Sequence, residues 1–313
     1  MRVPTHILTM PGERQLAYSL YGAPDGRPVH FFHGFPNSRL LAAMVHEKAA
    51  AAGVCLVAAD RPGFGASSPI PGRSLADWPT QVVALADHLG HSRFDVIGVS
   101  CGGAYALACA AQLPHRIGRV ALLAGMGPMD RPGIRRAQLP ALKAMFGAAK
   151  LHPWLASPMF LLDRLFLRNP DRAFRMVASL LTPPDRAVLD AEPDVARHFI
   201  ASMTEAYRQG IGAAMQEARL IAQPRPYRLE DIRVPVHVFQ GGADRHVPEA
   251  MGHYLARTIP AAHWHLFPGE GHLSIVWNRF DECLAALAGD FRAPAPSSSN
   301  PANRRRASTN AGR

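Results

Sequence analysis

The sequence has few of the residues and patterns that mark secreted or metal-binding proteins. Its only four cysteines show neither a CxxC pair nor metal-ligand spacing; they are Cys55, Cys101, Cys109 and Cys283. In a chain of 313 residues, scattered cysteines are expected to be reduced packing residues rather than a disulfide framework. The amino-terminal stretch lacks the apolar segment of a signal peptide. We therefore expect a cytoplasmic protein without a bound metal.

Long hydrophobic runs are also scarce. One charge-free run, residues 96–113, has the length of a short membrane span, but it contains three glycines, a serine and a glutamine. Its pattern changes midway from strand-like to helix-like, which argues against a spanning helix. We expect no membrane insertion.

Basic runs interleaved with aromatic residues are missing as well, although the net charge is +10. Residues 291–313 hold five arginines and no acid, and they are rich in proline, serine and asparagine. Such a segment has little to bury, so we expect a disordered basic tail. The rest of the chain gives little support for nucleic-acid binding. A small molecule is the expected partner, and the oligomeric state is left open.

The pattern that is present is an alternation of short strand-like and longer helix-like segments. The strand-like runs, rich in β-branched or aromatic residues, are residues 28–34, 53–60, 94–100, 119–125, 234–242 and 263–269. Helix-like runs near 38–52, 76–90, 102–112 and 247–258 separate most of them. This alternation predicts a parallel sheet covered by helices. Residues 5–10 and 14–22 predict a hairpin at its edge.

The alternation stops between residues 125 and 231, where proline-punctuated helical segments replace the strands. Asn169 and Thr182, each followed by proline, look like helix N-caps, and Asp185 stands at the third position after Thr182. The block is too long for a loop and lacks strands. We therefore predict a core of residues 1–128 and 230–290, a helical cap over 129–229, and the tail.

One motif carries chemistry directly: "GVSCG", residues 98–102, fits G-x-S-x-G. It ends a β-branched run and begins an alanine-rich one, which is the context of a nucleophile at a sharp strand-to-helix turn. The glycines two positions away avoid crowding at such a turn. Ser100 is therefore the candidate nucleophile; the alternative is a bystander serine at a tight junction.

A serine hydroxyl needs a base to take its proton and an acid to orient that base. Of fifteen histidines, His272 follows the last predicted strand and lies at the edge that also displays Ser100. Asp244 follows the preceding strand, which satisfies the order Ser, Asp, His. Asp130 is the alternative acid. His246 is expected to belong to the helix near 247–258 as a packing residue.

Charge developing on a carbonyl oxygen needs two donors. The backbone N–H of Cys101 and that of Phe35, in the loop "HGFPNSR", are the candidate oxyanion donors, and the ring of Phe35 would wall the acyl pocket. His33 in that loop is expected to shape it by hydrogen bonding. The thiol of Cys101 is expected to be buried and inert.

These residues together resemble the α/β-hydrolase superfamily. The motifs are "HGFP" at 33–36, "DRPGFGAS" at 60–67, "GVSCGG" at 98–103, "GGADRHVP" at 241–248 and "GEGH" at 269–272. The resemblance implies an α/β fold with a mostly parallel eight-stranded sheet, helices on both faces and an inserted helical cap. It also implies the roles given above to Ser100, Asp244, His272, Phe35 and Cys101, and it makes "DRPGFGAS" a structural turn.

The sequence thus predicts a serine hydrolase that cleaves a carboxylic ester of a small to medium, partly apolar substrate through an acyl-enzyme, with no metal or organic cofactor. Two alternatives stay open: hydrolysis of a carbon–carbon bond at the same site, and a receptor-like protein that binds a ligand with negligible turnover. The serine at the elbow disfavours dehalogenases and epoxide hydrolases of this fold, which use aspartate there.

Overall fold

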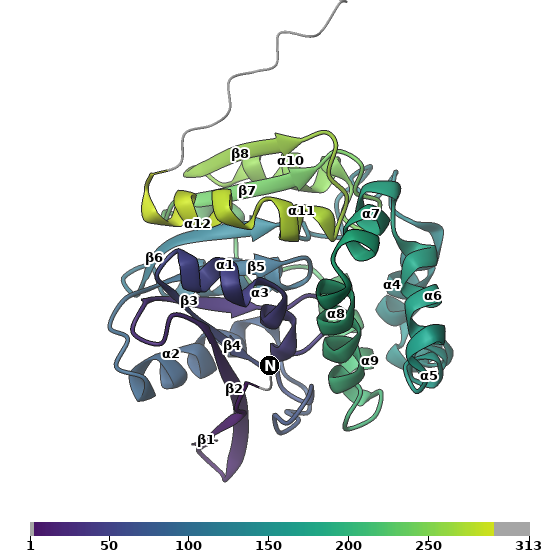
Figure 1. Ribbon diagram of the computed structural model, residues 1–313, viewed down its shortest axis with the longest axis horizontal. Helices are drawn as coiled ribbons and strands as arrows, with labels where there is room; N and C mark the ends of the chain where they lie inside the picture. Colours follow the sequence, from purple (N-terminus) through teal and green to yellow (C-terminus); the bar gives the residue numbers. More distant parts are fainter. Residues whose placement is uncertain (1–2, 291–313) are drawn as a thin grey trace, which may run out of the picture.

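The computed structural model describes residues 3–290 and joins eight strands in one sheet (Figure 1). The order is β1-β2-β4-β3-β5-β6-β7-β8; β2 runs antiparallel to β1 and β4, and every other pair is parallel. The prediction of a mostly parallel eight-stranded sheet is confirmed, and the predicted tail lies outside the described residues. The strands are β1 (His6–Met10), β2 (Arg14–Gly22), β3 (Arg27–Phe32), β4 (Val54–Ala59), β5 (Phe94–Val99), β6 (Ile117–Leu123), β7 (Val236–Gly241) and β8 (Ala262–Phe267).

The central strands β4 and β5 are buried along their whole length. Parallel strands covered on both faces carry such continuous apolar runs. At the edge of the sheet, β1 and β2 form the predicted antiparallel hairpin, and β1 is mostly exposed.

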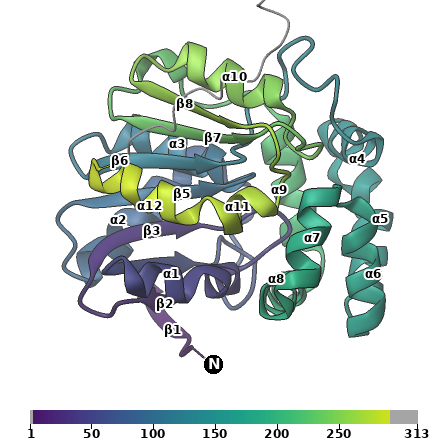
Figure 2. The same cartoon turned by 45° about the horizontal axis from the view of Figure 1, so that its top comes forward.

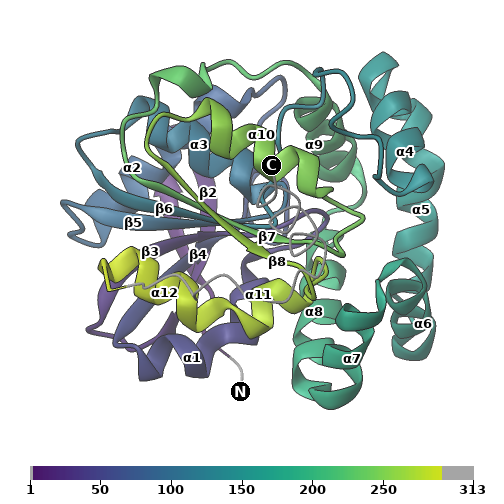
Figure 3. The ribbon, with the colours of Figure 1, turned by 90° about the horizontal axis from the view of Figure 1, so that it is seen from above.

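Helices cover both faces of the sheet: α2, α3 and α10 lie on one face and α1, α11 and α12 on the other (Figure 3). Nine of the eleven residues of α3 are buried. The apolar side chains of the charge-free run, residues 96–113, are therefore covered by the protein itself. Within residues 3–290, no helix combines the length and the apolar character needed to cross a membrane. These helices are α1 (His46–Ala51), α2 (Trp78–His88), α3 (Gly102–Gln112), α10 (Glu249–Thr258), α11 (Ser274–Asn278) and α12 (Phe280–Ala288), with short 3-10 turns η1 (Arg39–Val45), η2 (Leu75–Asp77) and η4 (Leu229–Asp231).

Between β6 and β7 the described chain forms helices and no strand, as the sequence predicts. These helices stand together at one side of the sheet (Figure 2). Prolines in the first turn fix where several of them begin, and Asn169 and Thr182 are N-caps as expected. They are α4 (Pro140–Leu151), η3 (Pro153–Ala156), α5 (Ser157–Phe166), α6 (Pro170–Leu180), α7 (Pro183–Ala191), α8 (Pro193–Ala206) and α9 (Gly212–Ala222).

Parallel pairing brings the carboxyl ends of β3, β5, β7 and β8 to one edge of the sheet. The loops that leave these ends carry Phe35, Ser100, Asp244 and His272, in that order. In open α/β sheets this edge is where ligands bind. The fold therefore places every candidate site residue on the same side of the sheet.

Candidate active site

Ser100 occupies a left-handed turn between β5 and α3. Its φ is 53°, its N–H donates to the carbonyl of Leu123 at 3.0 Å, and its own carbonyl accepts from Gly103 and Met126, each at 2.9 Å. A non-glycine residue in this region of backbone space is strained and is held there by its surroundings. Strain at this one serine fits a residue that a sharp turn presents for chemistry.

The glycines around Ser100 make this turn sterically feasible. A Cβ at Gly102 would lie 2.2 Å from the carbonyl oxygen of Phe32, and a Cβ at Gly98 would lie 2.8 Å from the Cα of Gly103. Real Cβ atoms do not approach backbone atoms so closely. The G-x-S-x-G spacing is therefore explained by close contact between β5, the start of α3 and the end of β3.

Asp244 and His272 form a hydrogen-bonded pair across the loops after β7 and β8. Oδ2 of Asp244 lies 2.7 Å from Nδ1 of His272, while Oδ1 accepts the N–H groups of His246 and Val247 at 2.8 and 2.9 Å. The carboxylate is buried, so its orientation is fixed by these contacts. Burial by itself lowers the pKa of His272, but the charge and hydrogen bond of Asp244, together with the charge of Asp185, outweigh it and raise that pKa above 6.5.

The structure brings Asp244 to His272 but does not do the same for Asp130. Asp130 is exposed in the segment after β6, and no ion pair or hydrogen bond links it to His272 among residues 3–290. Within the same residues, no hydrogen bond joins the hydroxyl of Ser100 to the ring of His272. Contacts between a nucleophile and its base often tighten only when substrate binds.

The two candidate oxyanion donors lie in the loop after β3 and at the start of α3. Among the described residues, neither the N–H of Phe35 nor that of Cys101 donates a hydrogen bond. The ring of Phe35 is surrounded by other aromatic rings, with centroids 5.8 to 6.4 Å away; these are Phe64, Phe146 and Phe160. Two of them, Phe146 and Phe160, come from the helices between β6 and β7.

Two side chains in these loops have structural roles, as the sequence indicates. His33 is fully buried, with Nδ1 2.8 Å from the carbonyl oxygen of Gly34. The thiol of Cys101 is buried 3.6 Å from the sulfur of Met126, and burial raises its pKa to about 12. A thiol with such a pKa stays protonated and is a poor nucleophile at neutral pH.

Arg61, from the "DRPGFGAS" motif, does more than form a turn. Its guanidinium donates to the carbonyl oxygens of His33 and Gly34 at 2.5 and 2.9 Å, and it is fully buried. Nη2 of Arg61 also lies 2.7 Å from Oε1 of Glu217 on α9. The loop that carries Phe35 is therefore tied, through one arginine, to a helix of the inserted block.

Glu217 is the centre of a buried polar network. Besides Arg61, it accepts from Arg73 at 2.8 Å and from the hydroxyl of Tyr105 at 2.5 Å. Burial by itself would raise the pKa of Glu217, but the two arginines and the hydrogen bonds lower it. The carboxylate thus remains charged and serves two buried cations at once.

Two neighbours of His272 were not predicted in these roles. The ring of His246 stacks on the ring of His272, with centroids 4.7 Å apart and planes 19° from parallel. His246 precedes α10, which begins at Glu249, so its assignment to that helix was wrong. Asp185 on α7 accepts the N–H groups of Leu273 and Ser274. The sequence identified Asp185 only as an N-cap partner.

Asp244, His246 and His272 place potential metal-ligand atoms within 4.8 Å of one another. However, the imidazole lone pairs lie in the ring planes, and the two rings are stacked almost parallel. Those lone pairs therefore do not converge on one point, and Nδ1 of His272 already faces Asp244. The arrangement suits proton transfer better than metal binding.

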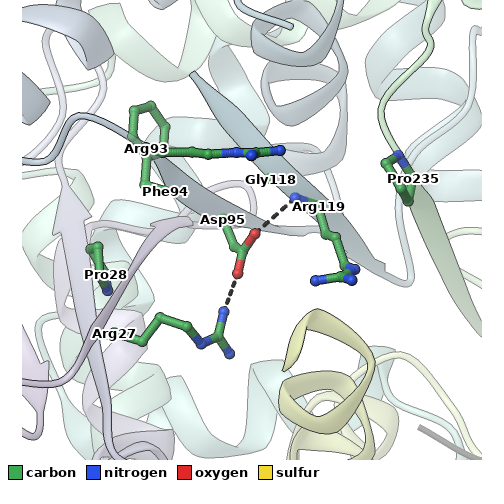
Figure 4. A pocket seen from close by; sticks show the side chains of 8 residues that line it. All are labelled: Arg27, Pro28, Arg93, Phe94, Asp95, Gly118, Arg119 and Pro235. Carbon is green, nitrogen blue, oxygen red and sulfur yellow. Dashed lines mark hydrogen bonds and ion pairs between the residues drawn. The ribbon is translucent and has the colours of Figure 1, made fainter. Parts of the chain in front are cut away.

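A cavity of about 470 Å³ lies at the opposite edge of the sheet, at the start of β3, β5 and β6 (Figure 4). Arg27 forms an ion pair there with Asp95, which also accepts the N–H of Arg119 at 2.7 Å. Its eight lining residues include no serine, cysteine or histidine. The cavity thus lacks the chemistry found at the carboxyl ends of the strands.

Comparison with known proteins gives consistent matches. Residues 27–279 match the model of the alpha/beta hydrolase fold family. The chain is 29% identical to 2-hydroxymuconate semialdehyde hydrolase of Pseudomonas putida over 77% of each chain. It is also 29% identical to 2-hydroxy-6-oxo-6-phenylhexa-2,4-dienoate hydrolase of Burkholderia cepacia over 78% of each. Among solved structures, a thermophilic esterase from Thermogutta terrifontis superposes with a TM-score of 0.65 at 23% identity, covering 91% of this chain and 97% of the esterase.

Proposed function

Because the chain belongs to the alpha/beta hydrolase fold family, we propose that it is a serine hydrolase with Ser100 as nucleophile, His272 as base and Asp244 as orienting acid. The oxygen of Ser100 attacks a substrate carbonyl while His272 takes the hydroxyl proton. His272 then returns this proton to the leaving group. Water, deprotonated by the same histidine, releases the acid from the acyl-enzyme and regenerates the serine.

One observation carries this proposal: the strained Ser100 and the hydrogen-bonded pair of Asp244 and His272 lie in loops at the same edge of one sheet. The φ of 53° is costly for a non-glycine residue, and the 2.7 Å contact between Asp244 and His272 is specific. The combination of the two supports a nucleophile with a base and an orienting acid. The unengaged N–H groups of Phe35 and Cys101 are the proposed oxyanion donors.

We also propose that residues 129–229 form a cap over this site, between core segments 1–128 and 230–290. Phe146 and Phe160, which pack against Phe35, come from this block. The cap would thus supply part of an aromatic wall beside the oxyanion loop.

The proposed substrate is a carboxylic ester with a small to medium, partly apolar acyl group. The three phenylalanine rings that pack against Phe35 favour such a group because they make its surroundings apolar and uncharged. The nearby arginines Arg61 and Arg73 are buried and paired with Glu217, so they are not free to bind a substrate carboxylate.

Hydrolysis of a carbon–carbon bond is the second candidate. The two curated relatives described above, each matching more than three quarters of the chain, are named as hydrolases of a semialdehyde and of a dienoate. The same serine would attack a ketone carbonyl, but the bond that breaks would join the carbonyl carbon to a carbon atom of the leaving group instead of to an oxygen atom, and the proton from His272 would go to that carbon atom. The two candidates share the triad and differ in what the pocket must hold.

Two measurements test the proposal. A fluorophosphonate probe is expected to label the wild type and not Ser100→Ala; a folded wild type that resists labelling would refute an activated serine and favour the receptor-like alternative. Steady-state rates with alkanoyl esters, thioesters and dienone carboxylates then identify the bond. Serine-dependent turnover of esters but not of dienones supports the first candidate, and the reverse pattern supports the second.

A further inference from the structure

Asp185 is a fully buried acid on α7, in the block between β6 and β7. Its Oδ1 accepts the N–H groups of Leu273 and Ser274 at 2.8 and 2.9 Å. Its Oδ2 accepts the N–H and the hydroxyl of Thr182 at 3.2 and 2.7 Å. One side chain therefore joins the start of α7 to the two residues that directly follow His272.

A capping role alone does not account for this arrangement. In a capping box, the side chain of the third helical residue makes one contact, to the N-cap N–H, and Oδ2 of Asp185 makes this contact with Thr182. The contacts of Oδ1 lie 88 and 89 positions away in the sequence. These two hydrogen bonds hold the segment after His272 and do not help to cap the first turn of α7.

The residue before His272 is packed against the same carboxylate. A Cβ at Gly271 would lie 2.4 and 2.5 Å from the two carboxylate oxygens of Asp185 and 2.3 Å from the hydroxyl oxygen of Thr182. Only glycine permits this approach without displacement. The backbone on both sides of His272 thus rests on Asp185, before it by close packing and after it by hydrogen bonds.

The charge of Asp185 also acts on His272. Burial by itself would raise the pKa of Asp185, but hydrogen bonds from Ser274 and Thr182 and the charge of His272 lower it, so the group is ionised at neutral pH. The titratable groups that face His272 are Asp244 and His246 from the loop after β7, and Asp185 from α7. Burial lowers the pKa of His246 to about 4, so that ring is neutral and the two carboxylates supply the negative charge around His272.

We propose that Asp185 is a positioning residue for His272: a carboxylate of the inserted helices fixes the backbone around the base and sets where its ring lies relative to Ser100. The inference rests on the proposed role of His272. It also means that α7 and the loop after β8 move as one piece, so a displacement of α7 would displace the base.

The test compares Asp185→Asn with Asp190→Asn, since Asp190 is an exposed acid on the same helix. An amide keeps one acceptor oxygen but loses the charge and the second acceptor. We expect kcat and the rate of fluorophosphonate labelling to fall about 10- to 100-fold in Asp185→Asn. KM is expected to change little, and the acid limb of the pH profile to move to lower pH. Asp190→Asn is expected to behave as wild type.

Direct titration of His272 by NMR separates positioning from general loss of structure, since it needs no turnover. A lowered pKa of His272 in folded Asp185→Asn, with slower labelling, supports the proposal. An unchanged pKa and an unchanged labelling rate overturn it. If Asp185→Asn does not fold, Gly271→Ala takes its place. The added methyl group would push the loop away from Asp185, while the negative charge of Asp185 is retained. Slower labelling by folded Gly271→Ala supports the proposal, and a wild-type rate overturns it. An unlabelled wild type refutes the proposed function instead.

Discussion

The carboxylate of Asp244 holds His272 with one oxygen and its own loop with the other. Oδ2 lies 2.7 Å from Nδ1 of His272, and Oδ1 accepts the N–H groups of His246 and Val247. The contacts of Oδ1 fix the orientation of Asp244, so its Oδ2 is held as an acceptor facing Nδ1 of His272. This contact favours the tautomer of His272 in which Nδ1 carries the proton. In the proposed mechanism, Nε2 is then left as the acceptor for the proton of Ser100.

Asp244→Asn is expected to lower kcat by on the order of 10³- to 10⁴-fold, because an amide no longer stabilises the imidazolium or the required tautomer. Asp130→Asn should leave kcat near the wild-type value, since Asp130 is exposed and, among the described residues, makes no hydrogen bond or ion pair with His272. Steady-state kinetics of both variants decide the matter. The reverse result would move the role of the acid to Asp130.

The pH dependence of activity follows from the raised pKa of His272. A base must be neutral to accept a proton, so kcat/KM of the wild type is expected to fall as pH drops through a value above 6.5. In Asp244→Asn the midpoint should move to lower pH, because the charge that favours the imidazolium is gone. A midpoint that stays in place would show that another group controls the profile.

The same pair links stability to pH. The pKa of His272 is higher in the folded protein than its ordinary 6.5, so protonation favours the folded state. This contribution is complete below 6.5 and is lost as pH rises through the folded pKa. The free energy of unfolding of wild type should therefore exceed that of His272→Gln by more at pH 5.5 than at pH 9, as measured by urea unfolding. A constant difference would contradict the linkage.

Glu217→Gln should destabilise the fold by about 3–5 kcal/mol, because it leaves Arg61 and Arg73 buried without their counter-ion. Tyr105→Phe removes two hydrogen bonds, one that the hydroxyl donates to Glu217 and one that it accepts from Arg73, and should cost about 1–2 kcal/mol. Denaturant unfolding of the two variants gives the comparison. Equal losses would mean that the charge of Glu217 contributes no more than an ordinary hydrogen-bond acceptor.

Gly102→Ala is expected to be strongly destabilising and to abolish labelling of Ser100, since its Cβ would lie 2.2 Å from the carbonyl oxygen of Phe32. Gly212→Ala, at the start of α9, is the matched control because nothing lies within 4 Å of the position of its Cβ. Replacing a helical glycine in open space should leave stability unchanged or raise it by up to about 1 kcal/mol. Thermal unfolding and probe labelling check both expectations, and a stable, labelled Gly102→Ala would contradict the steric account of the elbow.

The sheet, the elbow and the order of the site loops could be predicted because each depends on local pattern: β-branched runs, glycine spacing and residues placed just after strands. Asp185 shows the limit. Its capping contact with Thr182 is three residues away and was predicted, whereas its contacts with Leu273 and Ser274 need the packed fold. Glu217 left a fainter signal, as an acid among apolar residues of α9. His246 was misplaced because the helix begins at Glu249, two residues after the predicted start near 247.

Glu217 also limits which segments of this protein can be exchanged with those of a relative. Arg61 and Arg73 belong to the segment before β5, while the carboxylate that neutralises them comes from α9. Consider a chimaera in which the helices between β6 and β7 come from another family member. Arg61 and Arg73 would then be buried without a counter-ion, unless the donor sequence has an acid at the position of Glu217. We therefore expect a stable chimaera only when the segment with Arg61 and Arg73 and the helix with Glu217 are exchanged together.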